Sequence, residues 1–189
     1  MKSTVTTQRY KAVIIFLIPF LVLVSSTIFF YSGFSPEGRM NKGELIDPPI
    51  NFDTLDIEGP ETGYLGSWII LHFLEGPCET ACWNSLYKTR QVNIRLGKDS
   101  SRLVRLLVFT DRSELSKENL TKLATEYPRL IVRKINKDNI SNNKLLYMYK
   151  DSYILFDPLG NGILLYRPNL TGGELLKDLK KVLQNSKIG

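Results

Sequence analysis

The two cysteines of this chain are the residues whose type and spacing point most directly to chemistry. Cys78 and Cys82 are its only cysteines, and they form a Cys-x-x-x-Cys pattern within residues 76–82, GPCETAC. Such a pair can form one disulfide or offer two sulfurs to a soft metal such as Cu(I). Two cysteines exclude a four-thiolate zinc or iron–sulfur site within one chain, and a single histidine excludes a site that needs two imidazoles.

The context of the pair favours a reactive thiol. An apolar run at 67–74 predicts a buried strand directly before it, and residues 79–96 can form a helix directly after it. The dipole and unpaired amides at a helix N-terminus stabilise the thiolate of Cys78. Residues four apart share a helix face but do not form a disulfide in an ideal helix, so Cys78 must lie on the preceding loop or the first turn must loosen. The pattern predicts a redox or metal role for Cys78 and Cys82; a structural disulfide and two unrelated buried thiols are the alternatives.

The single histidine, His72, lies on the predicted strand before the cysteines. By strand alternation it is on the same side as Trp68, Ile70 and Leu74. It is a candidate third metal ligand if that side meets the cysteine loop, and otherwise a packed, hydrogen-bonded core residue. Trp83 follows the second cysteine, and three roles are open for it. It shields the cysteine pair from solvent, anchors a partner protein, or packs in the core.

The chain after the cysteines alternates short apolar runs with helical segments. This order, β-α-β-α-β-(α)-β-β-α, predicts a parallel sheet core with a closing antiparallel hairpin. Periodicity alone supports a small α/β sandwich, and the placement of the cysteines favours its thioredoxin-like version, a βαβ unit followed by ββα. The remaining predicted elements are strands at 103–109, 130–135, 153–156 and 163–166, a helix from Ser113 that Pro128 stops, a short helix at 139–149, and a helix at 173–183 capped by Thr171.

An apolar stretch near the N-terminus predicts a single transmembrane helix. Residues 12–31 carry no charge, and 20 residues at about 1.5 Å each can cross a hydrocarbon core of about 30 Å. The flanking positive charge lies in residues 1–11, which places that segment in the cytoplasm and the rest of the chain outside, in the periplasm of a bacterium. A cleaved signal peptide is the alternative, but its apolar region is usually shorter, so an uncleaved single-pass anchor in the inner (plasma) membrane is favoured.

Residues 32–60 read as a linker that becomes an extended arm, and residues 61–189 as the thioredoxin-like domain. The linker and arm are rich in glycine, proline and acidic residues, and the Asp-Pro-Pro sequence at 47–49 favours a polyproline-like conformation. Three apolar side chains could dock the arm on the domain: Ile50, Phe52 and Leu55.

Half of the net charge of +6 lies before the predicted membrane helix and indicates the orientation of that helix. Lys and Arg total 25 and Asp and Glu total 19, but Lys2, Arg9 and Lys11 lie in a head without any acid and make up half of the excess. The densest basic run of the domain, at 129–137, is interleaved with apolar residues at strand-like spacing. Because a nucleic-acid interface needs a clustered basic face, no nucleic-acid partner is expected.

Several short motifs give the chain a resemblance to a known family. Behind one membrane helix, the strand, Cys-x-x-x-Cys and helix resemble the Sco/SenC group of copper and redox proteins that assist cytochrome c oxidase assembly. The closer resemblance is to a bacterial set of Sco-like, thioredoxin-fold transmembrane proteins associated with that assembly. The matching segments are NKGELIDPP at 41–49, GPCETAC at 76–82, Tyr87 with RQV at 90–92, DPLGN at 157–161 and SKIG at 186–189.

The chain departs from the Sco pattern at one position. The resemblance to Sco proteins implies a copper site made of two cysteines plus a histidine shortly before the late Asp-Pro turn. The corresponding stretch here, YMYKDS at 147–152, has no histidine. Tyr149 stands roughly where it would be, and Met148 is a soft substitute. Many thioredoxin-fold oxidoreductases also place a cis-proline near the position that Asp151 or Ser152 holds here. The resemblance therefore implies thiol–disulfide exchange more than copper delivery.

Three functions follow as hypotheses, and whether the protein is an enzyme stays open. The first is a membrane-anchored, periplasm-facing assembly factor in which Cys78 attacks and Cys82 resolves a mixed disulfide with a cysteine of a metallation partner. The second is Cu(I) delivery to the oxidase by Cys78 and Cys82, with a third ligand from His72, Met148 or the partner. The third is a non-catalytic interaction protein of the oxidase complex. In each case the expected partners are cytochrome c oxidase subunits or assembly factors.

Overall fold

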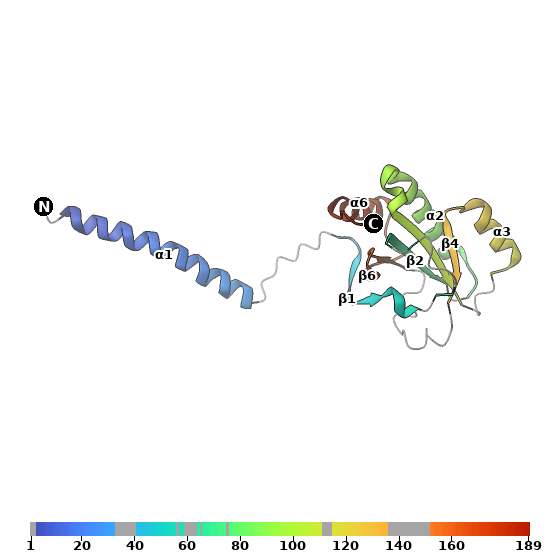
Figure 1. The fold of residues 1–189 in the computed structure, drawn as a ribbon, viewed down its shortest axis with the longest axis horizontal. Helices are drawn as coiled ribbons and strands as arrows, with labels where there is room; N and C mark the ends of the chain where they lie inside the picture. Colours follow the sequence, from blue (N-terminus) through green and yellow to red (C-terminus); the bar gives the residue numbers. More distant parts are fainter. Residues whose placement is uncertain are drawn as a thin grey trace. The chain divides into compact units, whose positions relative to one another are not determined.

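The computed structural model of the chain contains two compact units, Met1–Met40 and Asn41–Gly189. Each unit is described by itself, and Figure 1 gives the order and labels of their elements. The structure describes residues 3–32, 41–55, 57–58, 64, 66–74, 76–110, 115–135 and 152–189.

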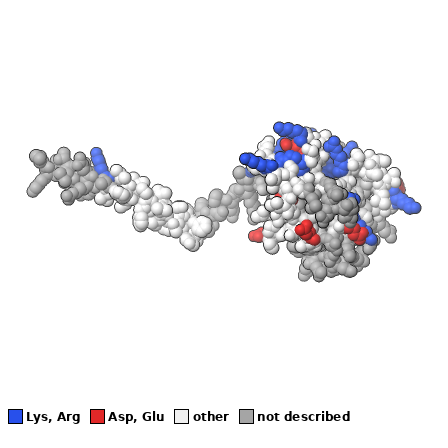
Figure 2. Space-filling view, in the orientation of Figure 1, with Lys and Arg blue, Asp and Glu red and all other residues white. Residues whose placement is uncertain are grey.

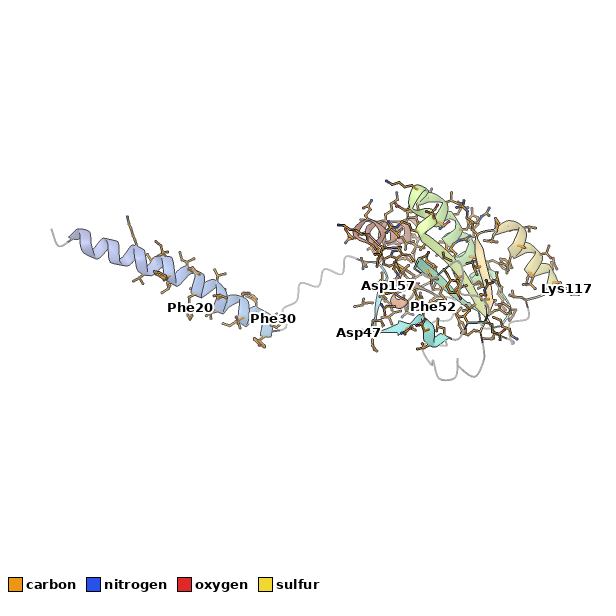
Figure 3. The ribbon with its side chains drawn as sticks, in the orientation of Figure 1. Phe20, Phe30, Asp47, Phe52, Lys117 and Asp157 are labelled. Carbon is orange, nitrogen blue, oxygen red and sulfur yellow. A yellow bond between two sulfur atoms is a disulfide. The ribbon has the colours of Figure 1, made fainter. Side chains whose placement is uncertain are left out.

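The first unit consists of one long helix, α1 (Ser3–Tyr31). Its segment Val13–Tyr31 has a mean hydropathy of 2.7 and is long and apolar enough to cross a membrane. None of that segment is buried against other parts of the chain, and aromatic side chains such as Phe20 and Phe30 extend from the helix into open space (Figure 3). The predicted single apolar helix near the N-terminus is confirmed.

The second unit is built on a six-stranded mixed sheet with the order β1-β6-β5-β2-β3-β4. Strands β2, β3 and β4 are parallel, whereas β5 pairs antiparallel with β2, β6 with β5, and β1 with β6. This is the thioredoxin-like arrangement predicted from the sequence, a parallel core with an antiparallel hairpin. The strands are β1 (Glu44–Asn51), β2 (Trp68–Leu74), β3 (Leu103–Phe109), β4 (Leu130–Lys134), β5 (Tyr153–Phe156) and β6 (Asn161–Tyr166).

The helices of this unit begin and end where local capping residues place them. The last helix, α6 (Gly172–Asn185), starts at Thr171, whose side chain forms a capping box with Glu174. The helix predicted from Ser113 begins later, as α3 (Lys117–Glu126), because the Ser116 hydroxyl accepts from the Asn119 amide as an N-cap. The helix predicted at 139–149 lies outside the described residues. The other helical elements are α2 (Thr80–Arg95) and the short 3₁₀ turns η1 (Phe52–Leu55) and η2 (Gly97–Arg102).

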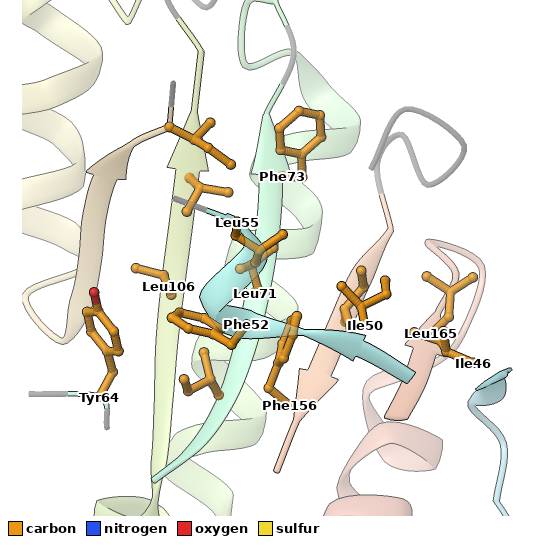
Figure 4. Packing of buried hydrophobic residues seen from close by; sticks show 14 residues of the cluster. Ile46, Ile50, Phe52, Leu55, Tyr64, Leu71, Phe73, Leu106, Phe156 and Leu165 are labelled. Atoms are coloured by element: carbon orange, nitrogen blue, oxygen red, sulfur yellow. The ribbon is translucent and has the colours of Figure 1, made fainter. Parts of the chain in front are cut away.

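Successive residues of β2 point to opposite faces of the sheet, and apolar side chains cover each face. One face carries Ile69, Leu71 and Phe73 and is covered by Ile50 and Phe52 of the N-terminal arm (Figure 4). The other face carries α2 and α6 over one half and α2 with α3 over the other half. The side chains that α2 and α6 contribute to the first of these halves are Val92, Leu96, Leu175, Leu179 and Leu183.

The arm expected from the sequence forms an edge strand of the sheet. In β1, Glu44 lies opposite Leu165 and Asn51 opposite Asn161. The pairing is interrupted between Leu45 and Ile50, where the two prolines lie, because proline has no N–H to donate to a partner strand. The apolar residues expected to dock the arm, Ile50, Phe52 and Leu55, are all buried.

One buried carboxylate holds the start of the arm against α6. Asp178 is buried on α6, and its Oδ2 accepts hydrogen bonds from the backbone N–H groups of Lys42 and Gly43. An added Cβ at Gly43 would lie 2.8 Å from the ring of Tyr166, so only glycine allows this close approach. The arm is therefore held at one end by this carboxylate and at the other by apolar burial.

The C-terminal tail is held by a single guanidinium group. Arg102 donates to the carbonyl oxygens of Leu183, Ser186, Ile188 and Gly189. These four bonds satisfy carbonyl groups at and beyond the end of α6, which no further helical turn would satisfy. The SKIG ending thus packs back on the domain.

Asp178→Ala is expected to lower the free energy of unfolding of the domain by about 3 kcal/mol, because it leaves two backbone N–H groups without an acceptor. Asp178→Asn keeps one acceptor oxygen and should cost less. Urea unfolding of the full chain in detergent, followed by tryptophan fluorescence, measures both. The matched control is Asp53→Ala on the same arm, where the carboxylate is exposed; equal losses in Asp178→Ala and Asp53→Ala would contradict this role.

Candidate functional site

The two cysteines form a disulfide at the start of α2. The Cα atoms of Cys78 and Cys82 are 5.3 Å apart. Helix α2 begins at Thr80 after the N-cap residue Glu79, whose backbone is extended, so Cys78 lies on the loop before the helix and Cys82 in its first turn. Of the two arrangements that the sequence analysis allowed for a disulfide, the structure has the one in which Cys78 lies on the preceding loop. Gly76, with φ of 95°, turns the chain between β2 and this loop in a conformation that other residues rarely adopt.

Apolar side chains surround the disulfide. Cys78 is 7% exposed and Cys82 is 9% exposed. Both belong to a cluster between the sheet, α2 and α3, so little sulfur surface is open to a small thiol in solution. The other buried members of this cluster are Leu74, Leu86, Leu107, Leu123, Tyr127 and Leu130.

Trp83 lies at the rim of this cluster. Its ring is partly buried against the cluster, with its centroid 6.2 Å from that of Tyr127. The ammonium of Lys122 lies 4.2 Å from the centre of the Trp83 ring, which is cation–π geometry. Of the three roles expected for Trp83, packing is the one that these contacts support.

His72 lies behind the disulfide, on the side of β2 that α2 covers. Its ring is 5.2 Å from that of Tyr153, and its Nε2 is 3.1 Å from the hydroxyl of Thr89. The Thr89 hydroxyl is also 3.2 Å from the carbonyl oxygen of Leu86. The neutral imidazole thus has a polar partner inside the core, and the tautomer of His72 decides which of the two groups donates.

Burial keeps His72 uncharged. Removal of the imidazole from water, together with the positive charge of Arg105, lowers the pKa of His72 from 6.5 to about 3. A neutral imidazole offers no positive charge to a cysteine thiolate. The N-terminus of α2, which adjoins Cys78, is a separate source of positive electrostatic potential at this loop.

A small cavity connects the histidine to the disulfide. It measures about 20 Å³, and His72, Cys82, Ser85 and Ser152 are among its lining residues. Ser152 is one of the two positions at which the family resemblance implies a cis-proline; the other, Asp151, lies outside the described residues. Ser85 and Thr89 were not predicted from the sequence, although positions 82, 85 and 89 follow the spacing of one helix face.

The described residues supply two sulfurs for a soft metal but not a third ligand. Nowhere in the described ranges do three or more His, Cys, Asp or Glu side chains come together as a metal site. Cys78 and Cys82 are adjacent, whereas the Nε2 of His72 bonds to Thr89. Met148 and Tyr149 lie outside the described residues.

Comparison with known proteins identifies the family and fold. The family described as "Transmembrane-like, thioredoxin-like, C-terminal domain" matches residues 68–186. A solved structure of yeast Sco1 with copper bound has 20% sequence identity and a TM-score of 0.52, covering 65% of this chain and 81% of that chain. Arabidopsis thaliana ScoI with copper bound has 20% identity and a TM-score of 0.53, covering 76% and 99%. At such identities these likenesses establish the shared fold, and no curated protein sequence matches the chain.

The neutral state of His72 predicts a specific acid sensitivity. Because the pKa of His72 is lower in the folded state than in the unfolded state, its neutral form stabilises the fold above pH 6.5, and this stability is lost as the pH falls towards 3. Between pH 7 and pH 4 the wild type should lose about 3 kcal/mol more unfolding free energy than His72→Gln, which does not titrate. Urea unfolding at each pH measures the unfolding free energy of both proteins. Because both carry the same carboxylates, the contribution of these groups cancels in the difference between them. Parallel pH profiles would contradict the buried neutral state.

Proposed function

The chain belongs to the transmembrane-like, thioredoxin-like family, and on that premise we propose that it is a membrane-anchored thiol–disulfide protein that assists assembly of cytochrome c oxidase. The observation that carries the proposal is the disulfide between Cys78 and Cys82 at the start of α2, directly after the central strand. Helix α1 would anchor the chain in the inner membrane, and Lys2, Arg9 and Lys11 before it would hold the N-terminus in the cytoplasm and the domain in the periplasm. The oxidase partner is inferred from the family resemblance of the sequence motifs.

Cys78 is the attacking thiol in this proposal. It precedes the N-cap, and the side chain of Glu79 makes no capping hydrogen bond, so the first-turn amides of α2 remain available to a thiolate on the loop. Cys82 lies within the first turn of α2 and lines the cavity that His72 and Ser152 share. These positions support attack by Cys78 and resolution by Cys82.

The exchange conserves atoms and electrons through a mixed disulfide. The Cys78 thiolate attacks one sulfur of a partner disulfide, and the other partner sulfur leaves as a thiolate. Cys82 then loses its proton and attacks the Cys78 sulfur, which releases the second partner thiolate and forms the internal disulfide. Two electrons pass to the partner; the reverse sequence, which starts from the internal disulfide, oxidises a partner dithiol.

The burial of both sulfurs supports a dedicated protein partner. A partner must dock on the loop before α2 and bring its own sulfur to the small exposed surface of the pair. A general reductant of small thiols would need a more open pair. The proposal therefore places specificity in the surface around the disulfide.

Cys82→Ser is expected to trap a partner, because the mixed disulfide on Cys78 then has no resolving thiol. Non-reducing gel electrophoresis of membranes that contain the full chain should show a disulfide-linked species that mass spectrometry can identify. Cys78→Ser is the matched control, since it removes the attacking thiol and should trap little or nothing.

In a strain that lacks the wild-type gene, the double variant Cys78→Ser, Cys82→Ser should lose oxidase activity at unchanged protein level. Full oxidase activity with the double variant would remove the thiol proposal and leave a non-catalytic interaction protein. Trapped partners unrelated to the oxidase, with oxidase activity intact, would keep the thiol chemistry and remove the oxidase role.

Cu(I) delivery is the second candidate, and the adjacency of two sulfurs favours it. Copper would be cargo held by reduced Cys78 and Cys82, and the described residues add no third ligand. Under the thiol proposal, the reduced full-length chain should lose Cu(I) to a chromophoric chelator in competition. Retention of one Cu(I) per chain, lost in Cys78→Ser but not in the matched Ser85→Ala variant, would favour copper delivery instead.

A further inference from the structure

A second pocket, separate from the disulfide, opens at the other end of α2. It measures about 310 Å³ and lies between α2, η2, β3 and the segment before β4. Arg90 on α2 lies about 12 Å along the helix axis from Cys82, at about 1.5 Å per residue. The lining residues that matter for its chemistry are Arg90, Asn93, Ser100, Arg105 and Arg129.

Arg105 is the unusual member of this group. It lies in β3 between apolar neighbours, Ile70 on β2 and Leu130 on β4, and it is 3% exposed. Its Nε and Nη1 atoms are buried, and in the described part of the chain no atom accepts a hydrogen bond from them. Burial of a guanidinium group without a partner is costly, and buried charges are normally paired.

The other charges at the pocket repel Arg105. Burial and the positive charges of Arg90 and Arg129, partly opposed by Tyr127, lower the pKa of Arg105 to about 10, so it remains a cation at neutral pH. Among the described residues that line the pocket none is acidic. Arg90 lies over the ring of Tyr127 at 5.5 Å, a contact that holds a guanidinium at the pocket without neutralising it.

We propose that this pocket binds a phosphate group. A guanidinium presents paired N–H donors that match the oxygens of phosphate, and a bound phosphate dianion would supply the acceptor that Arg105 lacks and the negative charge that the three arginines lack. The volume is at the lower limit of ligand pockets, which suits a phosphate with a small organic substituent. Such a group occurs both in soluble phosphate esters and in the headgroups of anionic lipids.

The surface around the site is consistent with an anionic ligand. Figure 2 shows Lys and Arg side chains gathered over the part of the domain that carries α2 and α6, with most of the acidic side chains in that view lying elsewhere. Such a distribution raises the local concentration of anions. The proposal rests on Arg105 and its neighbours and does not depend on the thiol chemistry.

Isothermal titration of the full chain in uncharged detergent micelles tests the site, with inorganic phosphate and glycerol phosphate as probes and chloride holding the ionic strength constant. Arg105→Met should weaken binding at least about tenfold, because it removes the buried fork of donors. The matched control is Arg95→Met, which removes an exposed arginine of α2 that does not line the pocket and should leave binding unchanged.

Thermal unfolding separates loss of binding from loss of fold. Without phosphate, Arg105→Met should unfold at no lower temperature than the wild type, because methionine removes an unpaired buried charge. Phosphate should raise the unfolding temperature of the wild type and of Arg95→Met but not of Arg105→Met. If Arg105→Met does not fold, the double variant Arg90→Gln, Arg129→Gln carries the same test.

Micelles that contain phosphatidylglycerol distinguish the two sources of phosphate. If phosphatidylglycerol micelles abolish the heat of glycerol phosphate binding and phosphatidylcholine micelles do not, the ligand is a lipid headgroup. If neither kind of micelle abolishes this heat, the ligand is a soluble phosphate ester. Equal phosphate affinity of Arg105→Met and the wild type would overturn the proposal. Absence of phosphate binding to the wild type with every probe would overturn it as well.

Discussion

Complete burial of strand β2 is the constraint on which the rest of the domain depends. All seven of its residues are buried, and it pairs with β3 on one side and β5 on the other. A strand covered on both faces requires a layer on each side of the sheet, which the arm supplies on one face and the helices on the other. The disulfide follows this strand directly, so its loop starts from one of the most constrained parts of the molecule.

The polar side chains of His72 and Arg105 lie in the largely apolar face of the sheet beneath the helices, and they differ in charge and in hydrogen bonding. His72 is neutral and its Nε2 forms a hydrogen bond with the hydroxyl of Thr89, so its burial costs little. Arg105 on the adjacent strand remains charged, and its buried Nε and Nη1 have no acceptor in the described ranges. The positive charge of Arg105 also disfavours protonation of His72, so the two buried polar groups on this face are electrostatically coupled.

Much of the fold could be predicted because strands and helices carry local patterns. The apolar runs of β2 and β3 and the capped start of α6 identified those elements to within about two residues. The arm was harder, because two prolines concealed an edge strand whose pairing is set by β6. The start of α3 was missed by a few residues, since both Ser113 and Ser116 are acceptable caps and the structure uses Ser116.

By itself the sequence determined one apolar helix, a thioredoxin-like order of elements, and a cysteine pair placed so that Cys78 precedes a helix. These are local properties, since strand and helix periodicity and helix capping depend on residues a few positions apart. Only the tertiary structure decided that His72 bonds to Thr89, that Asp178 holds the arm, and that Arg90, Arg105 and Arg129 share one pocket. The physical reason is that burial and pairing of polar groups depend on contacts between segments that lie far apart in the sequence, and only the packing of helices on the sheet brings those segments together.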